Sequence, residues 1–493
     1  MQDGSHRRKT SGVSLMIFAG SLALSAGSLD AFSYKLGGFA DQSAFIGFNN
    51  SKIDRTKGIY PTQRYATIAG YLGLDLDFSP KDSPHTIKTK IGGIVGGVLY
   101  DGTKNSIEGS AVNDFFGYYN GFWDGDLNLL DTDVDPAFIS HNKKINNAML
   151  NNNNRYYVFS DAYIEYNYKN YFGFKGGRYK SGMEYRSGWT QGFEVYGGGK
   201  DFRLTWFSSW GRAFAYGSYI QDWYAARPTM SGNYTKNAQG GWDAHGHEIL
   251  LGTHAVQFNY SRHKLQLEGF FYFSPKIFNA PGFKVVWDSN PNFAGRGFRS
   301  QTTLLAFFPI YYPWMLVNSK GARKYAFNTP TTHTGQSLAI KQRFDFDEFF
   351  VVGTFFKNFQ NPNYKVGNMG NPAGVLSGGN SIYAGGYGTA LKADAVTGNF
   401  GYGGKHFKDT FTWEMQWQWS SAPVSYDGRV TLLLGYTFNK ILSATITLAY
   451  FGMHTNKGYQ AGWNKPCVSS PTLYCGGGYQ DRSSLTTSLV ATF

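Results

Sequence analysis

The sequence has no long apolar run beyond its first thirty residues. No later segment approaches the ~20 consecutive apolar residues that a membrane-spanning helix requires. Proline is scarce, with 16 in 493 residues, and charged residues make up only 16% of the chain. If the chain crosses a membrane, it must therefore do so as a closed sheet in which every backbone group is paired.

Sequence signatures of enzymes are also missing. The chain has no G-x-S-x-G nucleophile motif, and glycine-rich runs such as 367–370 lack the strand, lysine and helix of a phosphate-binding loop. The acidic run 131–135 is reminiscent of a calcium loop, but the glycine and closing glutamate are absent at the required offsets. His245 and His247 would share a strand face and can in principle hold a metal, although a loop or girdle histidine is the simpler interpretation. We expect no enzymatic activity, no cofactor and no metal site.

The chain carries a basic excess that is not concentrated in one patch. Its formal charge is +13, from 46 lysines and arginines against 33 aspartates and glutamates. These basic residues are scattered through alternating segments without a basic helix or run, which argues against nucleic acid as a partner. A cationic surface lining an aqueous lumen fits the distribution better.

Aromatic residues and glycine are abundant. The chain contains 41 Phe, 35 Tyr and 12 Trp, together 18% of its residues, and 62 Gly. Aromatic side chains suit the girdles at the two membrane interfaces of a β-barrel, and glycine suits tight turns and bent strands. The composition therefore favours one large barrel over two or three soluble domains.

Residues 1–30 have the layout of a cleaved secretory signal, with a basic cluster at 6–9 before an apolar run at 13–24. Residues 31–493 are expected to form a single domain. Export to an oxidising compartment would allow Cys467 and Cys475, eight positions apart, to close a loop as a disulfide. A two-cysteine metal site is the alternative, but no histidine lies in that loop.

The last thirteen residues, 481–493, alternate between larger apolar side chains and polar ones. Their length suits a strand that crosses a bilayer at a tilt, although a soluble sandwich can also end on an amphipathic strand. A chain that stops on Phe493 resembles the bacterial outer-membrane β-barrels, in which a final phenylalanine is the usual assembly signal. This resemblance implies that the barrel assembly machinery is a partner.

The same period of two recurs from Phe32 onward and is clearest at 411–420, where Phe, Trp and Met alternate with polar residues. The pattern predicts an all-β fold, a transmembrane antiparallel β-barrel of about 18 strands. Counting back from the last strand predicts short periplasmic turns at 169–170 and 439–440. It places on the extracellular side the inserts near 101–155, 212–244, 309–334 and 359–382, and the loop between the cysteines.

Alternation also assigns basic side chains to the lumen, where lysine and arginine would attract anions and carboxylates. Each of them has an alternative role as the partner of a lumen carboxylate, for example of Asp75, Asp77, Glu268 or Glu414. The predicted pore-lining residues are Lys88, Lys90, Lys175, Arg178, Arg203, Arg299, Lys341, Arg343, Arg429 and Arg482, with Arg186 added from a candidate constriction.

That candidate constriction lies within residues 176–194, GGRYKSGMEYRSGWTQGFE, which read as strand, short loop and strand. Such a loop can fold inward and set the narrowest point of the pore, or it can remain exposed without touching solute. Together with the terminal strand and the repeated aromatic strands, this stretch is similar to the Hof-type outer-membrane proteins of Helicobacter and, more distantly, to the OprD-type porins. The Asp-x-Arg-x-x-Pro-x-x-Phe-x-Gly loop of OprD-type porins is matched only loosely, with Trp189 in the place of the proline.

The resemblance implies an 18-stranded channel with a basic ladder for carboxylate-bearing solutes. We therefore expect a protein of the bacterial outer membrane, in contact with lipid and lipopolysaccharide, that lets small hydrophilic and preferentially anionic solutes diffuse passively. The alternative function is a surface adhesin or receptor, whose long loops bind host-surface ligands on a barrel platform. The sequence leaves the choice between monomer and trimer open.

Overall fold

A computed structural model describes most of the expected barrel. The described residues are 32–54, 56–102, 156–225, 228–230, 234–236, 242–244, 248–250, 252–275, 278–311, 316–317, 323–324, 334–360, 388–459, 467 and 474–493. The predicted signal segment, the acidic run 131–135, and His245 and His247 lie outside these residues.

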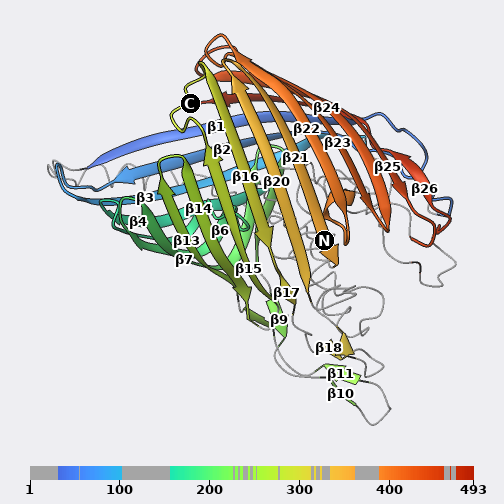
Figure 1. Ribbon diagram of the computed structural model, residues 1–493, viewed down its shortest axis with the longest axis horizontal. Helices are drawn as coiled ribbons and strands as arrows, with labels where there is room; N and C mark the ends of the chain where they lie inside the picture. The colour runs from blue at the N-terminus through green and yellow to red at the C-terminus, as the bar shows by residue number, and fades with distance from the viewer. Residues whose placement is uncertain are drawn as a thin grey trace, which may run out of the picture.

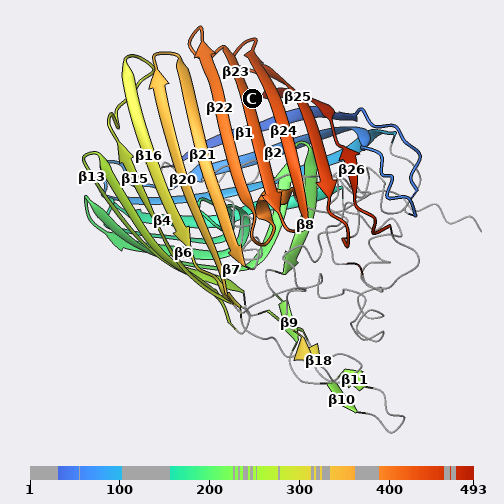
Figure 2. The same ribbon diagram turned by 45° about the vertical axis from the view of Figure 1, so that its right-hand side comes forward.

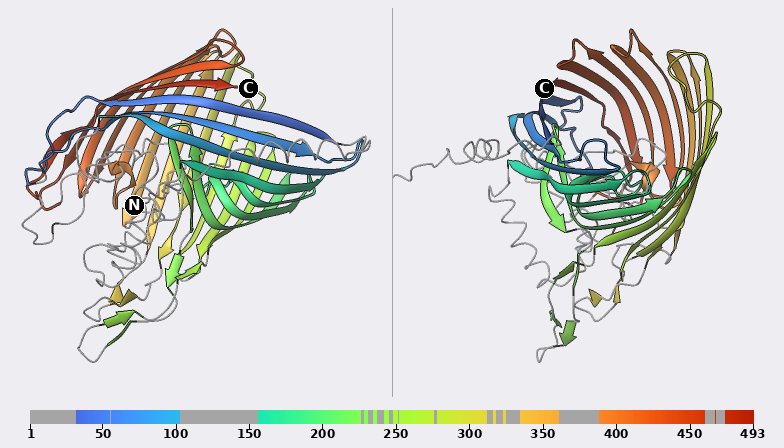
Figure 3. Two further views of the ribbon diagram at one scale, coloured as in Figure 1. Left: turned by 180° about the vertical axis from the view of Figure 1, so that it is seen from behind. Right: turned by 90° about the vertical axis from the view of Figure 1, so that its left-hand side faces the viewer.

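The chain forms a closed antiparallel barrel (Figure 1). Its main sheet has 21 strands, of which β8 (Tyr219–Ala225), β17 (Ile310–Tyr311) and β26 (Gly478–Asp481) are short additions to a neighbour. The other 18 make up the wall, and β1 (Ser33–Gly47) closes it by pairing with β27 (Ser484–Thr492). Figure 3 shows the red C-terminal strand beside the blue first strand. The predicted fold and strand number are confirmed.

Each remaining wall strand pairs with its neighbours round the barrel. In chain order these strands are β2 (Arg64–Asp77), β3 (His85–Asp101), β4 (Tyr157–Tyr168), β5 (Phe172–Ser181), β6 (Gly188–Gly198), β7 (Phe202–Tyr216), β13 (Thr253–Arg262), β14 (Leu265–Ser274), β15 (Phe278–Asp288), β16 (Phe298–Phe307), β20 (Gly335–Phe346), β21 (Phe349–Gln360), β22 (Val396–His406), β23 (Phe411–Ala422), β24 (Ser425–Thr437) and β25 (Leu442–Thr455).

Three small hairpin-like pairs stand apart from the wall. They are β9 (Pro228–Met230) with β12 (Glu248–Leu250), β10 (Tyr234–Lys236) with β11 (Trp242–Ala244), and β18 (Leu316–Val317) with β19 (Arg323–Lys324). In the part of the chain that the structure describes, no helix has the length and apolar character needed to cross a membrane.

The wall presents apolar side chains outward and polar ones inward because successive residues of a strand point to opposite faces. On β23, Trp419 is 55% exposed on the outer surface, whereas its neighbour Gln418 is 5% exposed on the inner surface. An apolar exterior of this kind requires a lipid environment.

The two ends of the barrel differ in the length of their connections (Figure 1). The inner end carries Phe493, whose N–H donates to the Gly38 carbonyl at 3.0 Å, and the short turns at 169–170 and 439–440. The long inserts leave from the opposite, outer end, as predicted. One predicted boundary is wrong, because residues 212–216 still belong to β7 and pair with β8.

The cysteines form the predicted disulfide. Cys467 and Cys475 are bonded, with their Cα atoms 6.1 Å apart. They lie between β25 and β26, so the bridge closes part of an outer-end connection.

Candidate functional site

The candidate site is the barrel lumen, into which three segments fold from the outer end. These lumen segments are the loop 182–187 between β5 and β6, the hairpin of β7 and β8, and a 3-10 helix, η4 (Thr389–Leu391). Figure 2 shows β8 in green behind β24.

The loop 182–187 reaches across the lumen and docks on β14 and β16. The Tyr185 side chain is fully buried, and its ring stacks on Phe307 with centroids 4.2 Å apart and planes 14° apart. The Tyr185 N–H donates to the Tyr272 hydroxyl at 3.3 Å, and Phe270 packs against the same ring at 5.3 Å. The loop therefore folds inward, as its sequence suggested, and aromatic packing holds it there.

A charged contact fixes the same loop to the wall. Lys284 Nζ on β15 lies 2.5 Å from a Glu184 carboxylate oxygen and 3.6 Å from Glu268 on β14. Arg186, the predicted pore-lining residue of this loop, is buried at 2% exposure. The remaining sequence-predicted members of the stretch lie in strands: Arg178 and Lys180 in β5, and Trp189 and Gln191 in β6.

The hairpin of β7 and β8 packs against the first strands of the barrel. Ile220 is fully buried in a cluster with Ala69, Ile94 and Val158, which belong to β2, β3 and β4. At the tip, Gly217 lies so close to the Asp41 carboxylate of β1 that a Cβ would overlap it. The hairpin thus covers the inner surface of this side of the wall.

The η4 helix is attached to the opposite side. The Thr389 N–H donates to Asp427 Oδ2 at 2.6 Å, and Asn358 Nδ2 donates to the Ala390 carbonyl at 3.0 Å. Leu391 packs in a buried cluster with lumen-facing residues of β16, β20 and β21. Capping of a backbone N–H by the carboxylate and packing of Leu391 together hold this segment inside the barrel.

Five of the eleven predicted lumen cations form an ion pair with a carboxylate in the structure. On β3, Lys88 lies 3.7 Å from Asp77 and Lys90 lies 3.2 Å from Asp75, both on β2. On β5, Lys175 Nζ lies 3.2 Å from Glu165 and 4.3 Å from the centre of the Tyr163 ring. These three lysines therefore have the alternative role named above, in which a lumen cation pairs with a lumen carboxylate.

A larger ionic network lies near the inner end of β15, β16 and β20. Arg299 contacts Asp288 at 2.5 Å and Asp345 at 3.9 Å, and Arg343 contacts Asp345 at 2.7 Å. Asp288 also accepts a hydrogen bond from Gln301 at 3.1 Å. The two arginines are therefore balanced by two carboxylates.

Arg203 and Lys341 differ from these residues. Counting described residues only, no carboxylate oxygen lies within 4.0 Å of either side chain. The Arg203 guanidinium stacks over the Tyr196 ring at 4.0 Å. Lys341 shares the inward face of β20 with Arg343, two residues away. Neither cation is held in a close ion pair, and the carboxylates that act on them, Glu194 on Arg203 and Glu414 on Lys341, do so from beyond that distance.

The other predicted cations have different surroundings. Arg178 lies on the face of β5 opposite to Lys175, where it donates to Gln191 at 3.0 Å and stacks over Trp223 at 4.8 Å. Arg429 is mostly buried over Phe451 at 5.4 Å. Arg482 is buried and donates to Gln480 at 3.0 Å. The structure thus does not bring all eleven residues together into one continuous ladder.

A pocket of about 560 Å³ lies next to the loop 182–187, toward the inner end. Its lining includes Lys175, Arg203, Glu194, Asn259 and, from the loop, Met183. Sequence reasoning did not single out Glu194 or Asn259, although both occupy inward positions of their strands. Among the described residues, no group of three or more His, Cys, Asp and Glu is arranged to hold a metal ion.

A closed antiparallel wall, apolar outside and charged inside, with loops folded into the lumen, is the architecture of a bacterial outer-membrane β-barrel. Residues 19–493 match the family described as "Putative outer membrane protein", and the chain belongs to that family. The protein is accordingly located in the bacterial outer membrane. Among curated proteins, none matches the sequence.

Solved structures with a similar fold include proteins of Acinetobacter baumannii and Pseudomonas aeruginosa. Acinetobacter baumannii OccAB2 has a TM-score of 0.57 and 9% identity, covering 94% of this chain and 98% of its own. OccAB1 of the same organism has a TM-score of 0.56 and 9% identity, covering 95% and 97%. Pseudomonas aeruginosa OpdK with vanillate has a TM-score of 0.54 and 9% identity, covering 95% and 99%. At this identity the similarity establishes the fold.

Proposed function

We propose that the protein is an outer-membrane porin through which small hydrophilic solutes diffuse passively, with a preference for anionic or carboxylated ones. The observation that carries this proposal is a barrel of 18 wall strands whose inward charges border a pocket of about 560 Å³ beside the infolded loop. A barrel of this size encloses an aqueous lumen. OpdK, which has a similar fold, has been crystallised with vanillate, an aromatic carboxylate.

The preference for anions rests on the two lumen cations, Arg203 and Lys341, that are not held in a close ion pair. A lysine or arginine paired at about 3 Å contributes little to the field felt by a solute, because its partner cancels its charge at a distance. The charges of Arg203 at the pocket and Lys341 on β20 are cancelled less completely, because Glu194 and Glu414 act on them only from beyond 4.0 Å. A unit charge about 4 Å from a solute contributes about 1 kcal/mol in water, which corresponds to a roughly fivefold local enrichment of anions.

Diffusion through this lumen needs no chemical step. A solute entering from the outer end passes the loop 182–187 and reaches the pocket, where Arg203 attracts its carboxylate. The Asn259 amide donates one hydrogen to Glu268 at 3.2 Å, and its second hydrogen can bond to the same solute. The solute then leaves through the inner end, past the network of Arg299 and Arg343.

The test is the reversal potential of the purified protein in a planar bilayer under a salt gradient. Replacement of both unpaired cations, Arg203→Gln with Lys341→Gln, is expected to lower the anion-to-cation permeability ratio severalfold. The matched control removes a compensated pair, Lys88→Gln with Asp77→Asn, and should leave the ratio unchanged. Unchanged selectivity in the first variant would contradict the assignment of anion preference. Absence of any conductance in the wild type would instead favour a barrel that serves as a platform for surface loops.

A further inference from the structure

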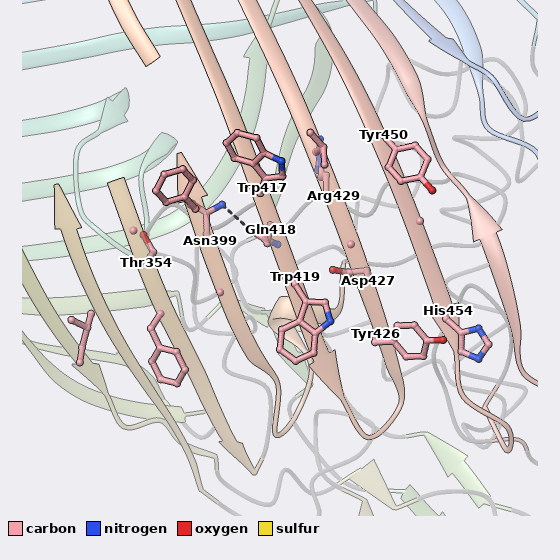
Figure 4. A pocket seen from close by; sticks show the side chains of 18 of the residues that line it. Thr354, Asn399, Trp417, Gln418, Trp419, Tyr426, Asp427, Arg429, Tyr450 and His454 are labelled. Atoms are coloured by element: carbon pink, nitrogen blue, oxygen red, sulfur yellow. Dashed lines mark hydrogen bonds between the residues drawn. The ribbon is translucent and has the colours of Figure 1, made fainter. Parts of the chain in front are cut away.

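A groove opens on the outward surface of β20 to β25, on the other side of the wall from the lumen (Figure 4). Its volume is about 1010 Å³. Because outward residues of these strands face the membrane, the groove is a feature of the lipid-facing surface. It takes no part in the proposed passage of solutes.

Three glycines, in one row with Trp419, form the floor of this lipid-facing groove. Gly398 lies opposite Trp419, Trp419 opposite Gly428, and Gly428 opposite Gly452, so the four residues form one row across β22 to β25. A Cβ added to Gly398 or Gly428 would meet nothing within 4 Å. Crowding within the chain therefore does not require glycine at these two positions. In a strand, glycine often marks a place where a ligand approaches the backbone closely.

Aromatic side chains form the walls of the groove. On the inner-end side stand Phe400, Trp417 and Tyr450, two residues along their strands from the floor. On the outer-end side, the Tyr426 and His454 rings stack with centroids 4.7 Å apart. Figure 4 shows Trp417 and Tyr450 on one side, and Trp419, Tyr426 and His454 together on the other.

Tyr479 of β26 closes one end of the groove. A Cβ added to Gly452 would lie only 2.7 Å from the Tyr479 ring, so this ring already covers the last glycine of the row. The floor beyond it, at Gly428 and Gly398, stays uncovered by described residues. The groove is therefore closed at the Tyr479 end and lined by aromatic side chains.

The depth of the groove places it in the outer leaflet. Gly398 lies two residues from the outer end of β22, and Gly428 and Gly452 lie three residues from the outer ends of β24 and β25. With a rise of about 3.3 Å per residue, the floor lies within about 10 Å of those ends. The connection between β23 and β24 is only Pro423 and Val424, which leaves the groove accessible from the membrane.

We propose that this groove binds one acyl chain of lipopolysaccharide. The part of the row that Tyr479 leaves open, from Gly398 to Gly428, spans about 10 Å at a strand spacing of about 4.8 Å. A stable contact with a second copy of the protein would need about 800 Å² per partner, several times the footprint of so short a row. A hydrocarbon chain of a neighbouring lipid can lie on this open floor, between the aromatic rings of its two sides.

A cation at the rim matches the anionic headgroup of such a lipid. Lys357 on β21 lies opposite Val396, two residues along β22 from Gly398 toward the outer end. Its Nζ donates to the Asp394 carbonyl at 2.8 Å, while the Asp394 carboxylate accepts the Gln360 N–H at 2.7 Å. In the described chain, no carboxylate oxygen lies within 4.0 Å of Lys357 Nζ. A lipid phosphate at this position would gain a charge-assisted hydrogen bond.

The test measures binding of bis-phosphorylated lipid A to the purified, delipidated protein by native mass spectrometry. Filling the floor with Gly398→Leu and Gly428→Leu is expected to lower lipid A occupancy at least tenfold while conductance stays unchanged. The control is Gly269→Leu, which also adds a side chain where a Cβ meets nothing within 4 Å. Gly269 faces lipid between Phe258 and Phe283 without a glycine row, so its substitution should leave occupancy unchanged.

Equal lipid A occupancy in the double variant and the control would overturn the proposal. So would a wild-type protein that forms dimers, loses them in the double variant and binds no lipid A in either form. If the heat-dependent shift in electrophoretic mobility shows that the double variant does not assemble, the single variant Gly428→Leu is tested instead. Equal lipid A occupancy in this variant and the control would then overturn the proposal. Lys357→Gln is expected to weaken lipid A binding about fivefold. Wild-type affinity in that variant would show that Lys357 does not bind the lipid headgroup.

Discussion

Tyr185→Ala should release the infolded loop and widen the pore. The Tyr185 side chain has no exposed surface and contacts Phe270 and Tyr272 on β14 and Phe307 on β16. Truncation removes all three ring contacts at once. The loop keeps the ion pair between Glu184 and Lys284 and the hydrogen bond that Arg212 donates to the Ser187 carbonyl at 3.1 Å.

The size of the effect follows from the packing that is lost. Replacing a buried aromatic side chain by alanine costs about 3–5 kcal/mol in a packed core. Because water from the lumen can fill the space left by the ring, we take the lower value, about 3 kcal/mol, for the docked state of the loop. A loss of that size shifts the docking equilibrium by a factor of roughly 100 toward the undocked loop.

Single-channel recording measures this change directly. We expect Tyr185→Ala to conduct with larger and noisier steps than the wild type, and the addition of Glu184→Gln to increase both effects. The control is Tyr34→Ala on the lipid-facing surface, where the tyrosine is 70% exposed and conductance should not change. An assembled Tyr185→Ala barrel with wild-type conductance would show that the loop does not set the narrowest point of the pore.

Three further predictions concern stability and assembly. Asp288→Asn should destabilise the barrel by about 1–3 kcal/mol in urea titrations, since it leaves Arg299 short of its main partner, and the added change Arg299→Gln should recover part of that loss. Cys467→Ser should leave the barrel folded while making the outer-end connection sensitive to protease, because a short disulfide loop contributes roughly 2–3 kcal/mol to local order. Deletion of Phe493 should slow assembly in cells more than it lowers the stability of the assembled barrel. The reason is that the residue contributes only two backbone hydrogen bonds, both with Gly38, and its side chain is 64% exposed. Equal assembly rates of the wild type and the deletion variant would contradict this prediction.

The sequence predicted the wall of the barrel well because alternation is a local property. The faces of β23, the turn at 439–440 and the end from which the inserts leave all follow from the side-chain period of two and the direction of the last strand. The disulfide followed from two cysteines and an expected oxidising compartment.

The interior could not be predicted in the same way because its contacts join distant parts of the chain. Tyr185 meets Phe307, and Lys284 meets Glu184, across a lumen whose packing leaves no periodic signal in the sequence. Alternation identified Arg299 as a lumen residue but not its partner Asp288. The boundary error at 212–216 has the same origin, since the end of β7 pairs with β8, a strand additional to the 18 of the wall.

The pairing of β1 with β27 bears on how the molecule is made. Phe39 pairs with Thr492, so the contact that shuts the cylinder joins residues almost a whole chain length apart. Until that contact forms, the growing sheet has two unsatisfied edges that can recruit other chains. High contact order makes such a closing step slow. Because of this topology, the unpaired edges of β1 and β27 must be protected from other chains until the barrel closes.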